Sequence, residues 1–158
     1  MAYTTLTWSA LRLLLHNRVE SKPYWDDTEA RLAMNEALSL WNLLTGSWRR
    51  STTLTTVANQ YEYVLPTSLL YRTRITFGGQ PLSPSSREEL NLGRPRWRSE
   101  TTTTGGDVPS RPTLFAPISL QLLYLWPADA VAGHTLTVEG IAATPVLVEE
   151  GDTVDLGF

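Results

Sequence analysis

The 158-residue sequence contains no cysteine, which excludes disulfide bonds, iron–sulfur clusters and thiolate metal sites. Charged residues are also scarce: they make up 18% of the chain, below the level of about a quarter that is typical of soluble proteins. A folded protein with so few charges has part of its surface covered by other chains. We therefore expect a protein that works in an assembly.

Long apolar segments are missing as well. The run Leu11-Arg12-Leu13-Leu14-Leu15 is too short and too charged for a signal peptide or a membrane span. The first residues, Met-Ala-Tyr-Thr-Thr, lack the basic region with which a signal peptide begins. We therefore predict a protein that stays in the cytoplasm in which it is made and has no membrane partner.

The sequence lacks the motifs of common enzymes. No serine lies in a Gly-x-Ser-x-Gly elbow, and no glycine-rich phosphate loop precedes a helix. The adjacent carboxylates Asp26 and Asp27 are explained by helix capping. Glu149, Glu150 and Asp152 match no calcium-loop pattern. We predict a non-catalytic protein with no cofactor and no metal site.

The only histidines, His16 and His134, are placed where neither is expected to bind a metal. His16 has no second histidine four positions away and Glu20 is the one acid at that spacing, and His134 opens a predicted strand after a turn. Metal sites need several ligands at characteristic spacings, and none is found here. Both histidines are predicted to have surface or capping roles.

Residues 1–47 predict a pair of helices. Thr5 or Thr7 can cap the first, and Ser21-Lys22-Pro23 ends it. Its apolar stripe consists of Trp8, Leu11, Leu14 and Leu15. Trp25, just before the second helix, is expected to act as a hydrophobic staple.

The second helix has the clearest start signal in the chain. Asp26, with Glu29 three residues later, predicts a capping box, and Gly46 predicts the C-cap. Between them, apolar residues recur at helical spacing and are expected to be buried; these are Ala30, Ala33, Met34, Ala37, Leu38, Trp41 and Leu44.

After Gly46 the apolar period changes from 3.6 to 2, which predicts β-strands. The expected strands are residues 48–57, 61–66, 69–77, 80–82, 113–116, 118–126 and 134–142. Gly78-Gly79 predicts a tight hairpin turn. Ser85 and Ser86, each with Glu three residues later, predict a short helix through Leu90. Residues 91–112, rich in Gly, Pro and Thr, are expected to form an irregular loop.

The expected fold class is therefore α+β: an N-terminal helical hairpin followed by an antiparallel β-sheet or a small β-sandwich. The expected parts are residues 1–47, 48–145 and 146–158, the last an acidic arm. Residues 51–100 carry a charge of +2 and residues 101–158 a charge of −6, which follows from the sequence. The acidic end and the basic middle either attract one another between copies or are simply solvated.

Arg94, Arg96, Trp97 and Arg98 combine cations with an aromatic ring. This combination can bind single-stranded nucleic acid by stacking and phosphate contacts. The interpretation that we favour packs Trp97 on the sheet, with the arginines facing acids of the same or a neighbouring subunit, because the net charge of the chain is −3.

Several short segments follow one another in a telling order. They are residues 26–37 (DDTEARLAMNEA), 43–50 (LLTGSWRR), 61–66 (YEYVLP), 74–82 (RITFGGQPL), 86–90 (SREEL), 97–98 (WR) and 123–128 (LYLWPA). This succession resembles the head-to-tail connector or adaptor (head-completion) proteins of tailed bacteriophages, which are related to tail tubular proteins. The resemblance covers residues 5–145.

The resemblance implies a virion structural protein at the head-tail junction. Its copies would form a ring, of about twelve subunits, beneath the portal, with a downstream tail or stopper protein on the other side. DNA would pass through the channel without sequence-specific binding. The candidate contacts with other subunits or the portal are Arg94, Arg96, Trp97, Arg98, Glu149, Glu150, Asp152 and Asp155.

Members of the family commonly continue with further helices after the Asp152-Thr153 segment. The chain would then be a truncated product, or a short arm replaces those helices. Three other functions stay open at this point. They are a tail or baseplate module that recognises a glycan or another tail protein, a small hydrolase, and a binder of single-stranded nucleic acid.

Overall fold

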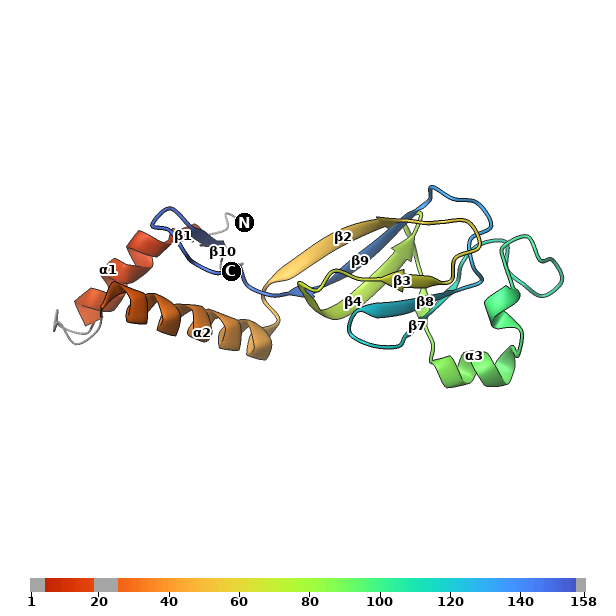
Figure 1. Ribbon diagram of the computed structural model, residues 1–158, viewed down its shortest axis with the longest axis horizontal. Coiled ribbons are helices and arrows are strands. Elements are labelled where there is room, and N and C mark those ends of the chain that lie inside the picture. Colours follow the sequence, from red (N-terminus) through yellow and green to blue (C-terminus); the bar gives the residue numbers. More distant parts are fainter. Residues whose placement is uncertain (1–4, 19–25, 156–158) are drawn as a thin grey trace. The chain divides into compact units, whose positions relative to one another are not determined.

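The computed structural model describes residues 5–18 and 26–155, and the chain divides into two compact units (Figure 1). Unit 1 comprises Met1–Trp48 and Ala143–Phe158, and unit 2 comprises Arg49–Ala142. The predicted α+β class is confirmed. The chain leaves unit 1, builds unit 2 and returns, so the segment predicted as a separate acidic arm belongs to unit 1.

Unit 1 consists of two helices and a two-stranded sheet. Helix α1 spans Trp8–Arg18 and α2 spans Asp27–Thr45. Strand β1 (Thr5–Thr7) pairs antiparallel with β10 (Thr153–Asp155). Thr7 caps α1, because its Oγ1 accepts a hydrogen bond from the backbone N–H of Ala10 at 3.2 Å. The predicted helix end at 21–23 and the Trp25 staple lie outside the described residues.

Helix α2 begins and ends as predicted. The Asp26 carboxylate accepts hydrogen bonds from the N–H groups of Thr28 and Glu29, at 2.8 and 2.7 Å, and Glu29 accepts from the N–H of Asp26 at 3.2 Å. This is the expected capping box. Gly46 ends the helix in the left-handed conformation, with φ of 60°, which a residue without Cβ adopts without strain.

The core of unit 1 differs from the predicted helical stripe. The buried apolar residues are Trp8, Ala30, Leu38, Leu147 and Val154. Trp41 and Leu44, expected inside, are 46% and 75% exposed. The buried side of α2 instead includes Asn42. The Oδ1 of Asn42 accepts a hydrogen bond from the N–H of Trp48 at 2.8 Å. Apolar residues lie on several sides of α2, so their spacing alone does not select the buried side.

Unit 2 is a small β-sandwich. One sheet has the strand order β2-β9-β4-β5 and the other β3-β8-β7-β6. The strands are β2 (Arg49–Thr55), β3 (Glu62–Val64), β4 (Leu69–Phe77), β5 (Gln80–Pro81), β6 (Ser83–Pro84), β7 (Leu114–Pro117), β8 (Leu122–Trp126) and β9 (Thr135–Ala142). All pairings among these strands are antiparallel except that of β6 with β7. Residues of both sheets, such as Ile75, Val138, Leu123 and Leu125, form one core.

Two local predictions in unit 2 are confirmed. Gly78 and Gly79 join β4 to β5 with φ of 52° and 80°. Ser86 forms a capping box with Glu89 at the start of α3 (Arg87–Gly93), with Ser86 Oγ accepting from the N–H of Glu89 at 3.0 Å. The pKa of Glu89 lies below its usual value because the Ser86 N–H and the Ser85 hydroxyl donate to its carboxylate.

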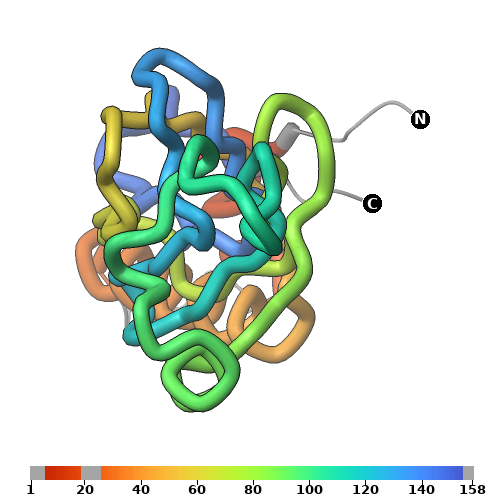
Figure 2. The backbone as a smooth tube through the Cα atoms, turned by 90° about the vertical axis from the view of Figure 1, so that its right-hand side faces the viewer, coloured from red at the N-terminus to blue at the C-terminus, as the bar shows by residue number. Residues whose placement is uncertain are grey.

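Residues 91–112 are more ordered than the predicted irregular loop. Helix α3 extends to Gly93, the 3₁₀ helix η1 spans Trp97–Ser99, and Thr101 forms a parallel bridge with Ala128. Figure 2 looks onto the end of unit 2 where α3 and this segment lie. The order has a clear source, because Trp97 is only 1% exposed and packs with Leu90, Ala116 and Trp126 in a second core.

A buried carboxylate ties the turn before β9 to the end of β2. Asp129, 2% exposed, accepts hydrogen bonds from Thr56 Oγ1 at 2.7 Å and the Val131 N–H at 3.1 Å, and its Oδ2 lies 2.7 Å from His134 Nδ1. Burial raises the pKa of Asp129, but the hydrogen bonds from Thr56, His134 and Val131 outweigh it and the net pKa is low. His134 therefore has a side-chain role at the surface, as predicted, but one that anchors a turn.

The stability of unit 2 is expected to depend on pH through His134. The hydrogen bond and the charge of Asp129 raise the pKa of His134 above its unfolded value. Because the pKa of His134 is raised on folding, its protonation stabilises the folded protein fully at pH values below the pKa in the unfolded chain, about 6.5. This stability is lost as the pH rises through the pKa in the folded protein. Thermal unfolding of the wild type should therefore show a falling midpoint in that window. In His134→Asn this fall in the thermal midpoint should be absent. An equal dependence of the midpoint on pH in both proteins would contradict the prediction.

Candidate interaction surfaces

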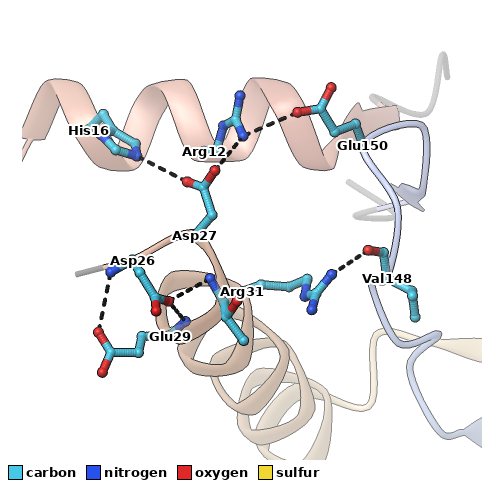
Figure 3. Close-up of polar contacts among 9 residues, drawn as sticks. Arg12, His16, Asp26, Asp27, Glu29, Arg31, Val148 and Glu150 are labelled. Carbon is cyan, nitrogen blue, oxygen red and sulfur yellow. Dashed lines mark hydrogen bonds and ion pairs between the residues drawn. The ribbon is translucent and has the colours of Figure 1, made fainter.

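The segment after β9 is fastened to both helices of unit 1 by charged groups (Figure 3). Arg12 of α1 lies 2.9 Å from the carboxylate of Asp27 at the start of α2 and 3.2 Å from that of Glu150. Asp27 also lies 3.9 Å from His16 Nε2. Arg12 thus links three separate stretches of chain. These groups are largely exposed, so each ion pair adds little stability and mainly fixes how the stretches lie.

Backbone groups of the same segment bond to polar side chains of α2. The Arg31 guanidinium donates to the Val148 carbonyl, as Figure 3 shows. Asn35 donates its Nδ2 to the Leu147 carbonyl at 3.1 Å and accepts from the Leu147 N–H at 2.9 Å. These two bonds satisfy both backbone groups of Leu147 and fix the position of the segment beside α2. Leu147 is thereby held in the core between the helices.

The acids predicted to contact other subunits are used in different ways. Asp152 Oδ2 accepts from the N–H groups of Val148 and Glu149, at 2.6 and 2.8 Å, and these bonds lower its pKa. Glu150 pairs with Arg12 of its own unit, and Glu149 is exposed. Asp155 pairs through its backbone with Thr5 in the β1–β10 sheet.

Among its described residues, unit 1 exposes more large apolar side chains than it buries. The exposed ones are Leu13, Leu14, Leu32, Leu40, Trp41, Leu43, Leu44, Val146 and Val148. A shallow groove lies on each side of Leu32, one lined also by Ala33 and Glu36 and the other also by Val146 and Val148. Contiguous exposed apolar surface of several hundred Å² marks an interaction site in soluble proteins.

The basic and aromatic residues of 94–98 all lie in unit 2. The Arg94 guanidinium lies 4.3 Å from the centre of the Trp126 ring, and that of Arg98 lies 5.0 Å from the Trp97 ring. The indole N–H of Trp97 donates to Asn91 Oδ1 at 2.9 Å. The two guanidinium groups therefore cover the rings of Trp126 on β8 and Trp97 on η1.

This arrangement confirms that Trp97 packs within its own unit, whereas contacts of the arginines with acids of a neighbouring subunit stay a prediction. Trp97 packs inside unit 2 as we favoured, so its ring is not available for stacking on a nucleic-acid base or on another subunit. Two of the arginines, Arg94 and Arg98, lie over aromatic rings, and among the described residues of this chain none of Arg94, Arg96 and Arg98 forms an ion pair. A guanidinium gains as much from an aromatic face as from an exposed carboxylate, and the rings lie nearby. Arg96 and Arg98 are exposed.

Within residues 5–18 and 26–155, no group of three or more His, Asp or Glu side chains is arranged to hold a metal ion. None of the helices in that part of the chain is long and apolar enough to cross a membrane. The Thr56–Asp129–His134 network resembles a catalytic triad in composition only. Its carboxylate bonds both to the hydroxyl and to the imidazole, so the imidazole does not lie between them as a general base would.

Sequence reasoning missed the outer leucines of α2 and the bonds to Asp129. Leu32, Leu40 and Leu43 are visible in the sequence as apolar residues off the predicted stripe, and they were the available signal for a second apolar side. Asp129 gives no such signal, because its partners Thr56 and His134 come together only through the pairing of β2 with β9.

The model of the SU10 adaptor protein family matches residues 1–157, almost the whole chain. The chain belongs to this family. The resemblance of the ordered segments to phage adaptors is thus confirmed at the level of a phage adaptor protein, and membership in the SU10 adaptor family implies a virion component. Among curated proteins, none matches the chain.

Proposed function

We propose that the protein is a non-catalytic head-to-tail adaptor whose copies form a ring beneath the portal and extend the DNA channel toward the tail. The match to the SU10 adaptor family over residues 1–157 is the observation that carries this proposal. The partners would be about eleven further copies, the portal protein, a downstream tail or stopper protein, and DNA that passes without sequence-specific contacts.

The surface of unit 1 supports a role in assembly. Among the residues that the structure describes, five apolar residues form its buried core, while the exposed set on α1, α2 and residues 146–148 is larger. A unit of this size with so small a core gains stability when neighbouring chains cover its apolar surface. A ring provides this cover for every copy at once, because each subunit offers two different faces to its neighbours.

The charged candidates that remain accessible belong to this proposal too. Arg96 and Arg98 of unit 2 and Glu149 of unit 1 are exposed, and they could attract opposite charges of neighbouring subunits or of the portal. Such contacts at the rim of an interface mainly raise the rate and specificity of association. The net charge of −3 suits a channel through which DNA must slide without sticking.

Electron microscopy of the full chain mixed with its portal protein tests the proposal. We expect a closed ring of the small protein on the tail-facing end of the portal, in register with the portal subunits. No association at any stoichiometry would overturn the proposal. Binding to glycans or to a baseplate protein without a portal ring would favour the tail module considered above.

A further inference from the structure

We propose that neighbouring copies contact one another through the outer side of α2 of one copy and the outer side of α1 of the next. The proposal rests on the ring-forming function above and adds the surfaces that would form the ring. Both sides belong to unit 1, and they are different surfaces, as a contact that closes by rotation requires.

The outer side of α2 is an apolar ridge with acidic residues. Leu32, Glu36, Leu40 and Leu43 follow one another at positions i, i+4, i+8 and i+11, which places them on one side of the helix. Leu32 and Leu40 are 59% and 58% exposed, and this side is opposite to the buried Leu38 and Asn42. The one basic residue of α2, Arg31, bonds to the Val148 carbonyl.

The outer side of α1 is apolar and basic. Leu13 and Leu14 are exposed, and Arg18 lies one turn after Leu14 on the same side. Helix α1 contains no acidic residue at all. Trp8 turns in the opposite direction, into the core with Ala30 and Leu38. Among the described residues, the exposed leucines therefore do not contribute to the core of unit 1.

A second copy fits this pair of surfaces better than a different protein does. Glu29 and Glu36 accompany the leucines of α2, while Arg18 accompanies those of α1. The two sides are thus complementary in charge and alike in apolar character, although they lie on the same chain. Leu32, Leu40 and Leu43 are 59%, 58% and 72% exposed, so their side chains can give a substantial share of the roughly 800 Å² that each partner gives to a standard interface.

A mixing experiment tests the proposal with two variants of the full chain. Leu14→Asp disables the α1 side, and Leu40→Asp disables the α2 side. Each variant alone should self-associate roughly 30-fold more weakly than the wild type or less still, as measured by analytical ultracentrifugation. An equimolar mixture should form dimers at near wild-type affinity, because the intact α2 side of the first variant meets the intact α1 side of the second.

Leu92→Asp is the matched control. Leu92 is 85% exposed but lies on α3 of unit 2, so its replacement should leave self-association unchanged. Circular dichroism and the thermal midpoint establish that each variant is folded. The design is sharpened by the absence of cysteine, since Leu14→Cys/Leu40→Cys should oxidise into ladders of covalent oligomers, whereas neither single cysteine variant should do so.

Three outcomes would overturn the proposal. The first is a wild-type chain that stays monomeric at its highest soluble concentration. The second is an unchanged Leu14→Asp beside a monomeric Leu40→Asp, which would mean that two α2 sides meet around a two-fold axis. The third is a ring on the portal formed by both variants as readily as by the wild type. In that last case the adaptor function stands and other surfaces form the ring, whereas failure of the wild type on the portal removes the function itself.

Discussion

Replacing Gly140 by alanine is expected to destabilise unit 2 by about 2–3 kcal/mol, the upper range for an overpacked core. Gly140 lies in the central strand β9, opposite Arg72 of β4 and Arg50 of β2. A Cβ at this position would lie 2.1 Å from the Tyr71 carbonyl oxygen and 3.0 Å from the Arg72 Cα. Both are backbone atoms, so no side-chain rotation relieves the clash.

The register of β4 explains why this space is so tight. The pairing of β4 with β9 is irregular between Leu69 and Tyr71 and again between Arg72 and Arg74. These irregularities carry the backbone of β4 toward β9, and only glycine leaves room for it. Alanine would force the two strands apart in the sheet that forms half of the sandwich.

Urea unfolding followed by circular dichroism, with hydrogen exchange of the β4 and β9 amides, measures the effect. Gly93→Ala is the matched control, because a Cβ at Gly93 meets no atom within 4 Å and the residue ends a helix. That variant should stay within about 0.5 kcal/mol of the wild type. Equal losses in the two variants would contradict the steric explanation.

Asp129→Ala is expected to cost a similar amount, about 2–3 kcal/mol. The change removes the acceptor for Thr56 Oγ1, the Val131 N–H and His134 Nδ1 at a buried position. The Thr56 hydroxyl would still accept from the His134 N–H, but its own proton would have no partner. An unmatched buried donor costs far more than the net gain from the bond that it replaces.

Asp107→Ala controls for loss of an acid, since Asp107 lies exposed in the same unit. Asp129→Asn distinguishes charge from hydrogen bonding, because it keeps one acceptor oxygen but not the negative charge. The stability that Asp129 adds is present above its unfolded pKa and is lost as the pH falls through its lower folded value. Unfolding in guanidinium chloride, at neutral pH and in acid, should therefore show that the free energy of unfolding differs less between the wild type and Asp129→Asn in acid. An equal difference at both pH values would contradict this.

Local signals in the sequence predicted the ends of elements well. Asp26 with Glu29, Ser86 with Glu89, and the glycines at 46 and 78–79 behave as expected. Each of these features depends on a few neighbouring residues, so the sequence contains all the information that is needed. The same holds for β9, in which every second residue is buried as predicted, whereas the irregular pairing of β4 breaks this alternation.

Features that depend on distant residues were not predictable in this way. The course of 91–112 is set by Trp97 packing against Trp126, and that of 146–155 by the bonds to Asn35 and by pairing with β1. For α2, which is apolar on several sides, burial of Leu38 but not of Trp41 is decided by what packs against it. The excess of leucine in α1 and α2 was visible in the sequence. Which side of each helix carries the exposed leucines was not.

The return of the chain to unit 1 has a consequence during synthesis. A nascent chain that has reached Ala142 contains every strand of unit 2, yet it lacks Leu147 and Val154 of the unit 1 core and the partner of β1. Unit 2 can therefore close its own core first, whereas unit 1 must wait for β10. The leucines of α1 and α2 that we assign to contacts between copies are therefore made early, but the unit that carries them completes its core only after residues 147–154 have been synthesised.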